Sequence, residues 1–212
     1  AANRITVTTP ASPSDAEAPA KAASRLSRGA RALLAVFGWQ VRFEGFPGPR
    51  GIAIVYPHTS NWDFVIGLLA KWTIDLPIRW VGKESLFRGF AGATLGRLMR
   101  HWGGRPVDRH HSSGAVDQLA ALMQSDPWFW LGISPEGTRR KTDRLRSGFY
   151  HLALKLDLPV GLAYIDYSRR EIGVTRFVHM SGDQERDLNM LRDYYADKVG
   201  RHPEQASTIT FK

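Results

Sequence analysis

The chain has 212 residues, of which 43% are hydrophobic, and it contains no cysteine. This size and composition support one domain with a sizeable core, and the lack of cysteine excludes disulfides, thiolate catalysis and cysteine-based metal sites. The formal net charge of +9 favours an anionic partner, such as nucleic acid, an anionic bilayer or a phosphorylated substrate. No apolar stretch reaches the roughly 18 residues of a membrane-spanning helix, and no secretory signal pattern opens the chain.

Residues 1–22 are rich in Ala, Pro, Ser and Thr without a hydrophobic period, so we expect a mobile tail followed by one domain over residues 23–212. Residues 24–39 follow a helical period. Their apolar stripe consists of Leu26, Ala30, Leu33, Leu34 and Phe37, and it is flanked by Arg25, Arg28 and Arg31. Such an amphipathic helix suits the headgroup region of an anionic membrane. It suits equally a helix that packs its stripe on the domain, and both interpretations stay open.

Short apolar runs typical of strands alternate with segments of helical period through the rest of the chain. Strands are expected at residues 41–44, 52–56, 78–81, 128–133, 159–165 and 171–178. Helices are expected from about residue 62, over residues 86–101 and 115–124, after Ser147, and from about residue 183. This alternation predicts an α/β fold, a single domain with a mixed, mainly parallel sheet flanked by helices.

The most informative stretch is residues 57–63, which read Pro-His-Thr-Ser-Asn-Trp-Asp between an expected strand and an expected helix. Strand-to-helix junctions are where α/β sheets usually present their chemistry. His58 and Asp63 would lie about 140° apart on one helix, so they can meet only if His58 is in the loop and Asp63 in the first helical turn. Asp63 could then hold one ring nitrogen of His58 and leave the other as a general base. Alternatively, Asp63 simply helps to cap the helix.

Three further loops that follow expected strands carry positive charge. Lys83 precedes a helix, residues 103–111 combine a flexible Gly-Gly start with Arg105 and Arg109, and residues 134–141 end in Arg-Arg-Lys. Arginine and lysine in such loops are typical contacts for a phosphate. Glu136 in the third loop could orient the arginines or accept a hydrogen bond from a substrate hydroxyl. Carboxyl ends of parallel strands share one edge of a sheet, so we expect these loops to lie together.

Four blocks of this sequence resemble the motifs of the glycerophosphate and lysophosphatidic-acid acyltransferase family, which includes the bacterial PlsC-like proteins. Residues 58–63 resemble its HX4D motif and residues 104–109 its second block. Residues 135–139 resemble its specific PEGTR block, and residues 158–163 its apolar fourth block. The order and separations also agree over about half of the chain. Pro57 stands where this family often has Asn, and the fourth block lacks a second proline, which leaves the acceptor open.

The resemblance implies the glycerolipid acyltransferase fold and transfer of a fatty acyl group from acyl-CoA or acyl carrier protein to a hydroxyl. The implied acceptor is a lysophospholipid such as 1-acylglycerol 3-phosphate, which would give phosphatidic acid. His58 is implied as general base and Asp63 as its orienting partner. The residues implied to line the acceptor site are Lys83, Arg105, Arg109, Glu136, Gly137, Thr138 and Arg139. No metal, no cofactor beyond the acyl donor as co-substrate and no covalent acyl-enzyme are implied.

A substrate of this kind lies in a bilayer, so we expect a peripheral protein on the cytoplasmic face of the cell membrane that contacts an anionic lipid surface. An acyltransferase for a different lipid or glycolipid acceptor is the main alternative. A basic nucleic-acid-binding module is a further one, but the sequence has no recognisable recognition helix, zinc pattern or RNP-like block. We therefore expect no nucleic-acid partner, and the sequence does not indicate an oligomeric state.

Overall fold

The computed structural model describes residues 24–83, 87, 89–107 and 112–211, so the expected tail at residues 1–22 lies outside the described residues. Helices and strands alternate along most of the described chain, as the sequence predicts. In chain order the elements are α1 (Arg25–Val36), β1 (Gln40–Phe43), β2 (Arg50–Val55), α2 (Trp62–Ile74), β3 (Arg79–Lys83), α3 (Gly89–His101), β4 (Gly104–Val107), α4 (Ser112–Gln124), β5 (Phe129–Ile133), α5 (Gly148–Leu156), β6 (Val160–Asp166), β7 (Glu171–Val178), α6 (Gln184–Tyr195) and the short 3-10 helix η2 (Pro203–Gln205).

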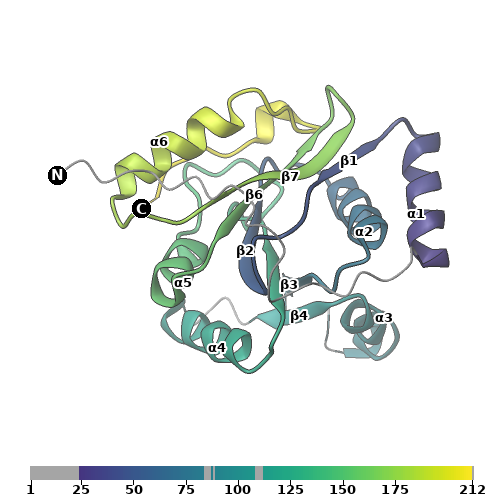
Figure 1. The fold of residues 1–212 in the computed structure, drawn as a ribbon, viewed down its shortest axis with the longest axis horizontal. Helices are drawn as coiled ribbons and strands as arrows, with labels where there is room; N and C mark the ends of the chain where they lie inside the picture. Colours follow the sequence, from purple (N-terminus) through teal and green to yellow (C-terminus); the bar gives the residue numbers. More distant parts are fainter. Residues whose placement is uncertain (1–23, 84–86, 88, 108–111, 212) are drawn as a thin grey trace.

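The strands form one 7-stranded sheet in the order β1-β7-β6-β2-β5-β3-β4 (Figure 1). Neighbouring strands are parallel except for β6 and β7, which are antiparallel. Strands β2 to β6 therefore all run the same way, and their carboxyl ends meet at one edge of the sheet. The fold is the single α/β domain with a mixed, mainly parallel sheet that the sequence predicts.

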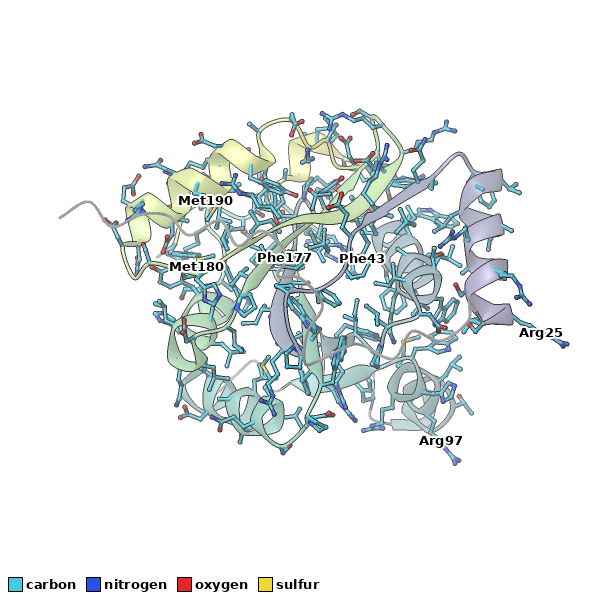
Figure 2. The ribbon with its side chains drawn as sticks, viewed as in Figure 1. Arg25, Phe43, Arg97, Phe177, Met180 and Met190 are labelled. Atoms are coloured by element: carbon cyan, nitrogen blue, oxygen red, sulfur yellow. The ribbon has the colours of Figure 1, made fainter. Side chains whose placement is uncertain are left out.

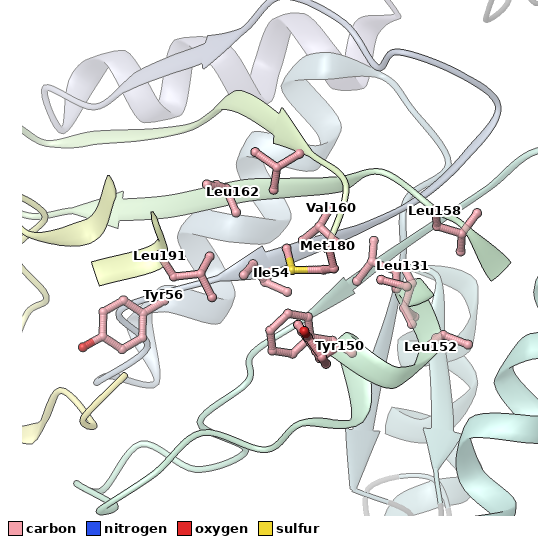
Figure 3. Packing of buried hydrophobic residues seen from close by; sticks show 14 of the residues in the cluster. Ile54, Tyr56, Leu131, Tyr150, Leu152, Leu158, Val160, Leu162, Met180 and Leu191 are labelled. Carbon is pink, nitrogen blue, oxygen red and sulfur yellow. The ribbon is translucent and has the colours of Figure 1, made fainter. Parts of the chain in front are cut away.

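Helices cover both faces of the sheet and bury a different core on each. On one face, residues of α4, α5 and α6 pack against alternate residues of the central strands, among them Ile54, Leu131 and Leu162 (Figure 3). On the other face, α1 and α2 build a smaller core from Leu34, Ile66 and Ala70. Strand β6 is buried along its whole length, as expected for a strand with helices on both sides. This packing holds the central strand ends, and so the loops that follow them, in fixed positions.

The end of the sheet at β4 differs from the sequence-based expectation. Residues 103–111 were expected to form a loop, but Gly104–Val107 is a strand that pairs with β3, with Arg105 beside Val81. Its Gly-Arg-Pro-Val sequence lacks the apolar alternation by which strands are recognised. Proline is tolerated here because an edge strand pairs on one side only.

Helix α1 divides its apolar stripe between the core and the surface. Ala30 and Leu34 are buried, and the Ser27 hydroxyl donates to the carbonyl oxygen of Thr73 at 3.0 Å, which ties the start of α1 to the last turn of α2. Leu33 is 46% exposed and Phe37 62% exposed. The helix therefore packs on the domain through one part of the stripe and leaves the other part uncovered.

The charged side chains of α1 and α3 point outward. Figure 2 shows Arg25 of α1 and Arg97 of α3 projecting from the same side of the molecule into solvent. Among the described residues, no helix has the length and apolar character that crossing a bilayer requires.

Candidate active site

His58 and Asp63 meet at the carboxyl edge of the sheet, where β2 gives way to α2. His58 lies in the loop and Asp63 in the first turn of α2, which is the arrangement that the spacing requires. The Nδ1 atom of His58 lies 3.1 Å from Oδ2 of Asp63. The His58 side chain is 19% exposed and the Asp63 side chain 1% exposed. The pair thus has its carboxylate inside the protein and its imidazole within reach of solvent.

Asp63 also takes part in capping α2, so the two interpretations of this carboxylate are compatible. The backbone amide of Ser60 donates to Oδ2 of Asp63 at 2.9 Å, and the hydroxyl of Ser60 accepts from the amide of Trp62 at 3.2 Å. These bonds satisfy amide groups that the start of a helix leaves without partners. One carboxylate oxygen therefore fixes both the backbone of the loop and the ring of His58.

The other oxygen of Asp63 is held by Tyr167. The Tyr167 hydroxyl donates to Oδ1 at 2.7 Å, and its ring meets the edge of Trp39 at a centroid distance of 5.0 Å. Tyr167 directly follows β6, at the same edge of the sheet as His58. A lone tyrosine 104 residues from its partner carries no sequence signal for this role.

The bonds to Asp63 decide its charge. Burial is the strongest influence and acts to raise its pKa, but the hydrogen bonds from His58, Tyr167 and Ser60 outweigh it and hold the pKa of this carboxyl below its ordinary value. Burial and the bond to Asp63 raise the pKa of the Tyr167 hydroxyl well above its ordinary value, so this hydroxyl remains a donor. Asp63 is thus ionised at neutral pH and occupies Nδ1 of His58, which leaves Nε2 as the ring nitrogen for proton transfer.

Glu136 is turned into the protein, where backbone amides contact its carboxylate. Its side chain is buried, with the residue 2% exposed. One carboxylate oxygen accepts from the backbone amide of His58 at 2.5 Å and the other from that of Ser207 at 3.0 Å. Burial, the strongest influence, raises the pKa of Glu136, although these bonds act in the opposite direction. Glu136 therefore braces the His58 loop against the C-terminal segment, because backbone amides satisfy both of its oxygens.

The rest of the loop after β5 turns outward from this brace. Gly137 has φ +66°, and a Cβ atom there would lie 2.4 Å from Nε of Arg146, so a larger residue would strain the backbone and require the Arg146 side chain to move. The Thr138 hydroxyl accepts from the amide of Arg140 at 3.3 Å, and Arg139 is exposed. The PEGTR-like block thus supplies a brace at Glu136, a turn at Gly137 and an exposed arginine at Arg139.

Of the other predicted cations, the structure describes Lys83 and Arg105. Lys83 is the last residue of β3, so its backbone ends at the edge where His58 lies. Arg105 lies within β4, and its Nε atom is buried without a hydrogen-bond partner. Arg109, like the paired histidines beside it, lies outside the described residues. Among the residues that are described, no group of three or more acidic or histidine side chains could hold a metal ion.

The C-terminal segment, residues 199–211, lies across the His58 loop, although no sequence motif indicates a role for it. The amide of His202 donates to the Thr59 hydroxyl at 3.1 Å, and the Tyr56 hydroxyl donates to the carbonyl oxygen of Ser207 at 2.7 Å. Gly200 approaches Thr59 so closely that a Cβ atom would lie 2.8 Å from its hydroxyl oxygen. Residues on both sides of His58 are therefore fixed by a segment that is distant in the sequence.

The parallel strands of this α/β sheet thus carry a buried aspartate paired with a histidine at their carboxyl edge. The profile of the Acyltransferase family matches residues 40–164, more than half of the chain. The chain therefore belongs to the Acyltransferase family, and the protein is an acyltransferase.

One solved structure shares the fold across most of both chains. It is the 1-acyl-sn-glycerophosphate (LPA) acyltransferase PlsC from Thermotoga maritima, with a TM-score of 0.52 and 14% sequence identity. The match covers 83% of this chain and 80% of that chain. At this identity the likeness shows the fold, which is the PlsC fold. No curated protein matches the chain.

Proposed function

We propose that this acyltransferase moves a fatty acyl group from acyl-CoA or acyl carrier protein to the free hydroxyl of 1-acylglycerol 3-phosphate. The observation that carries this proposal is the contact between His58 Nδ1 and the buried, ionised Asp63 at the carboxyl edge of the sheet. The positive loops at that edge support an acceptor that bears a phosphate. The net charge of +9 agrees with two anionic substrates.

In the proposed mechanism, Nε2 of His58 removes the proton of the acceptor hydroxyl as its oxygen attacks the thioester carbonyl carbon. Asp63 keeps Nδ1 protonated and stabilises the imidazolium that forms, as the aspartate does in serine hydrolases. Collapse of the tetrahedral intermediate breaks the carbon–sulfur bond, and His58 returns its proton to the departing thiol. The acyl group passes directly to the acceptor, so the step requires no covalent acyl-enzyme and no metal.

We further propose that the protein acts as a peripheral protein at the cytoplasmic face of the cell membrane. Its long-chain acceptor is scarce in water, so the enzyme gains by docking where the acceptor lies. Support comes from the uncovered part of the α1 stripe, where Leu33 and Phe37 are exposed next to arginines. An interfacial helix binds through such apolar area together with basic charge.

Mass spectrometry of the lipid products tests the reaction most broadly. Purified protein would receive acyl-CoA, or acyl carrier protein loaded with the same chain, and a panel of hydroxyl acceptors. The panel should contain lysophosphatidic acid, lysophospholipids with larger headgroups, a glycolipid and monoacylglycerol. We expect phosphatidic acid as the main product. Acylation of another lipid alone would keep the reaction class and replace the acceptor, whereas no product from any acceptor would contradict the proposal.

A further inference from the structure

The C-terminal segment places an arginine beside the loop that carries His58. Arg201 lies between Gly200, which contacts Pro57 and Thr59, and His202, whose amide bonds to Thr59. Because Pro57 and Thr59 flank His58, the backbone of Arg201 is fixed directly beside the catalytic loop. This position comes from residues outside the 40–164 region that the family profile matches.

The side chain of Arg201 lies over two aromatic rings that adjoin Asp63. Its guanidinium carbon is 5.7 Å from the ring centre of Trp62, the residue before Asp63, and 6.0 Å from that of Tyr167, which bonds to Asp63. Trp62 is 55% exposed, so this cluster faces solvent. Arg201 also makes a side-chain hydrogen bond with Tyr167. A guanidinium has five N–H donors, so donors beyond this bond remain for a ligand.

The charge of Arg201 has no carboxylate partner within the described part of the chain. The two acidic residues nearest to it in sequence are engaged elsewhere, since Asp197 pairs with Arg169 and Lys198, and Glu204 lies 3.8 Å from the ring of His202. Asp63 is buried and already accepts from His58, Ser60 and Tyr167. An exposed guanidinium without an internal counterion, fixed beside a catalytic base, is suited to an anionic part of the substrate.

From this arrangement we infer that Arg201 binds the phosphate monoester of the acyl acceptor, in a subsite formed by Arg201 and Trp62. The inference rests on the proposed function and deepens it, because it names the group that selects a phosphorylated acceptor. A guanidinium can bind a phosphate through two parallel N–H bonds. Binding at Arg201 would hold the acceptor beside the loop that carries His58.

The test compares two acceptors that differ only in phosphate, a short-chain 1-acylglycerol 3-phosphate and the matching 1-acylglycerol, both used as monomers in solution. Arg201→Ala should raise the KM of the phosphorylated acceptor on the order of 10- to 100-fold, the range expected for loss of a charge-assisted contact. The KM of the unphosphorylated acceptor and of acyl-CoA should stay within about twofold. Arg201→Lys, which keeps the charge without the planar fork, should give an intermediate rise.

Arg97→Ala is the matched control, because it removes the same charge from the exposed surface of α3. It should leave both acceptor KM values unchanged. If Arg201→Ala changed kcat equally for both acceptors, Arg201 would only support Tyr167, and the subsite would be wrong. A rise confined to the KM of acyl-CoA would assign Arg201 to the donor, and a loss confined to binding of anionic vesicles would assign it to the membrane surface; either result overturns the inference.

Equilibrium binding separates failure of the subsite from failure of the proposed function. Calorimetric titration with the short-chain 1-acylglycerol 3-phosphate requires no turnover. Wild-type protein that binds this ester, together with an Arg201→Ala variant that binds it at least tenfold more weakly, supports the subsite even if no acyl transfer is found. Equal binding by the two proteins, or binding by neither, rejects it. Arg201→Gln, which keeps most of the stem over Trp62, replaces Arg201→Ala if the latter unfolds at a lower temperature.

Discussion

Asp63 connects the fold to the chemistry through its two carboxylate oxygens. One oxygen receives His58 and Ser60, and the other receives the hydroxyl of Tyr167. Three donors around a buried carboxylate fix its rotamer as well as its charge. The orientation of the His58 ring therefore depends on Tyr167, a residue that does not touch His58 in any described contact.

Tyr167→Phe tests this dependence because it removes the hydroxyl and keeps the ring against Trp39. We expect the free energy of unfolding at neutral pH to fall by about 1–3 kcal/mol, the cost of losing a hydrogen bond to a charged group. The rate of acyl transfer should fall about tenfold, equivalent to about 1.4 kcal/mol in the barrier. Urea denaturation and initial rates measure the two effects.

The pH dependence distinguishes a bond to ionised Asp63 from a general packing effect. The pKa of Asp63 is lowered on folding, so its contribution to stability is present above the unfolded value of about 3.9 and is lost as the pH falls through the folded value. The difference in stability between wild type and Tyr167→Phe should therefore shrink as the pH falls from 7 to 3. A difference that stays constant over this range would contradict the assignment.

At the scale of elements, the His58 loop is held from two sides by segments that follow β5 and α6. Glu136 joins them, because it accepts from the backbone of His58 and from that of Ser207. The Tyr56 hydroxyl and the Thr59 hydroxyl add further bonds between the loop and the C-terminal segment. A loop that is tied at several points can place a catalytic base with the accuracy that proton transfer needs.

Glu136→Gln tests this connection. The amide of glutamine would replace one acceptor oxygen by a donor, so either the amide of His58 or that of Ser207 would lose its partner. We expect a loss of about 1–3 kcal/mol in the free energy of unfolding and faster hydrogen exchange at the amides of His58 and Ser207. Glu204→Gln, an exposed change on the same segment, should alter stability by less than about 0.5 kcal/mol. Unchanged exchange at both amides in Glu136→Gln would show that Glu136 is not the brace.

Features that depend on contacts between sequence neighbours can be predicted from the sequence. Features that depend on contacts between distant segments cannot. His58 and Asp63 could be paired from their spacing, because a loop and the first helical turn bring them together locally. Strand alternation also predicted that the basic loops share one edge. Tyr167, Ser207 and Arg201 could not be found, because their contacts join segments far apart in the chain and involve residue types that are common on any surface. The burial of Glu136 could not be predicted either, because its sequence neighbours in the loop are charged.

At the scale of the whole molecule, α1 presents its uncovered apolar residues to the surroundings. Leu33 and Phe37 are exposed, whereas Leu34 is buried against α2. Arg25, Arg28 and Arg31 lie on the same helix, and basic residues near an anionic bilayer contribute about 1 kcal/mol each. Together they would contribute about 3 kcal/mol at most, or about a hundredfold in partitioning.

Co-sedimentation with anionic liposomes at low and high salt tests membrane docking by α1. Leu33→Glu with Phe37→Glu should reduce binding at low salt on the order of a hundredfold, and binding by wild type should weaken at high salt because exposed charges are screened. Activity on a short-chain soluble acceptor should be retained. Leu154→Glu is the matched control, since Leu154 is 40% exposed on α5, in the helix layer on the opposite face of the sheet.

Three results would contradict docking by α1. Wild-type protein that stays in the supernatant at low salt would show that the exposed part of the stripe does not bind the bilayer. Equal loss of binding in Leu154→Glu would show that any added negative charge is sufficient. Loss of binding on Leu98→Glu alone would move the docking surface to α3, where Leu98 is 41% exposed.

The central claim is that His58, held by Asp63, is the general base of acyl transfer. The most direct measurement is the initial rate of phosphatidic acid formation from acyl-CoA and lysophosphatidic acid by wild type, His58→Ala and Asp63→Asn, with stability measured in parallel. We predict that His58→Ala loses about 10²- to 10⁴-fold in rate while it remains folded, and that Asp63→Asn loses somewhat less because it orients the ring. A folded His58→Ala variant that turns over at nearly the wild-type rate would contradict the claim.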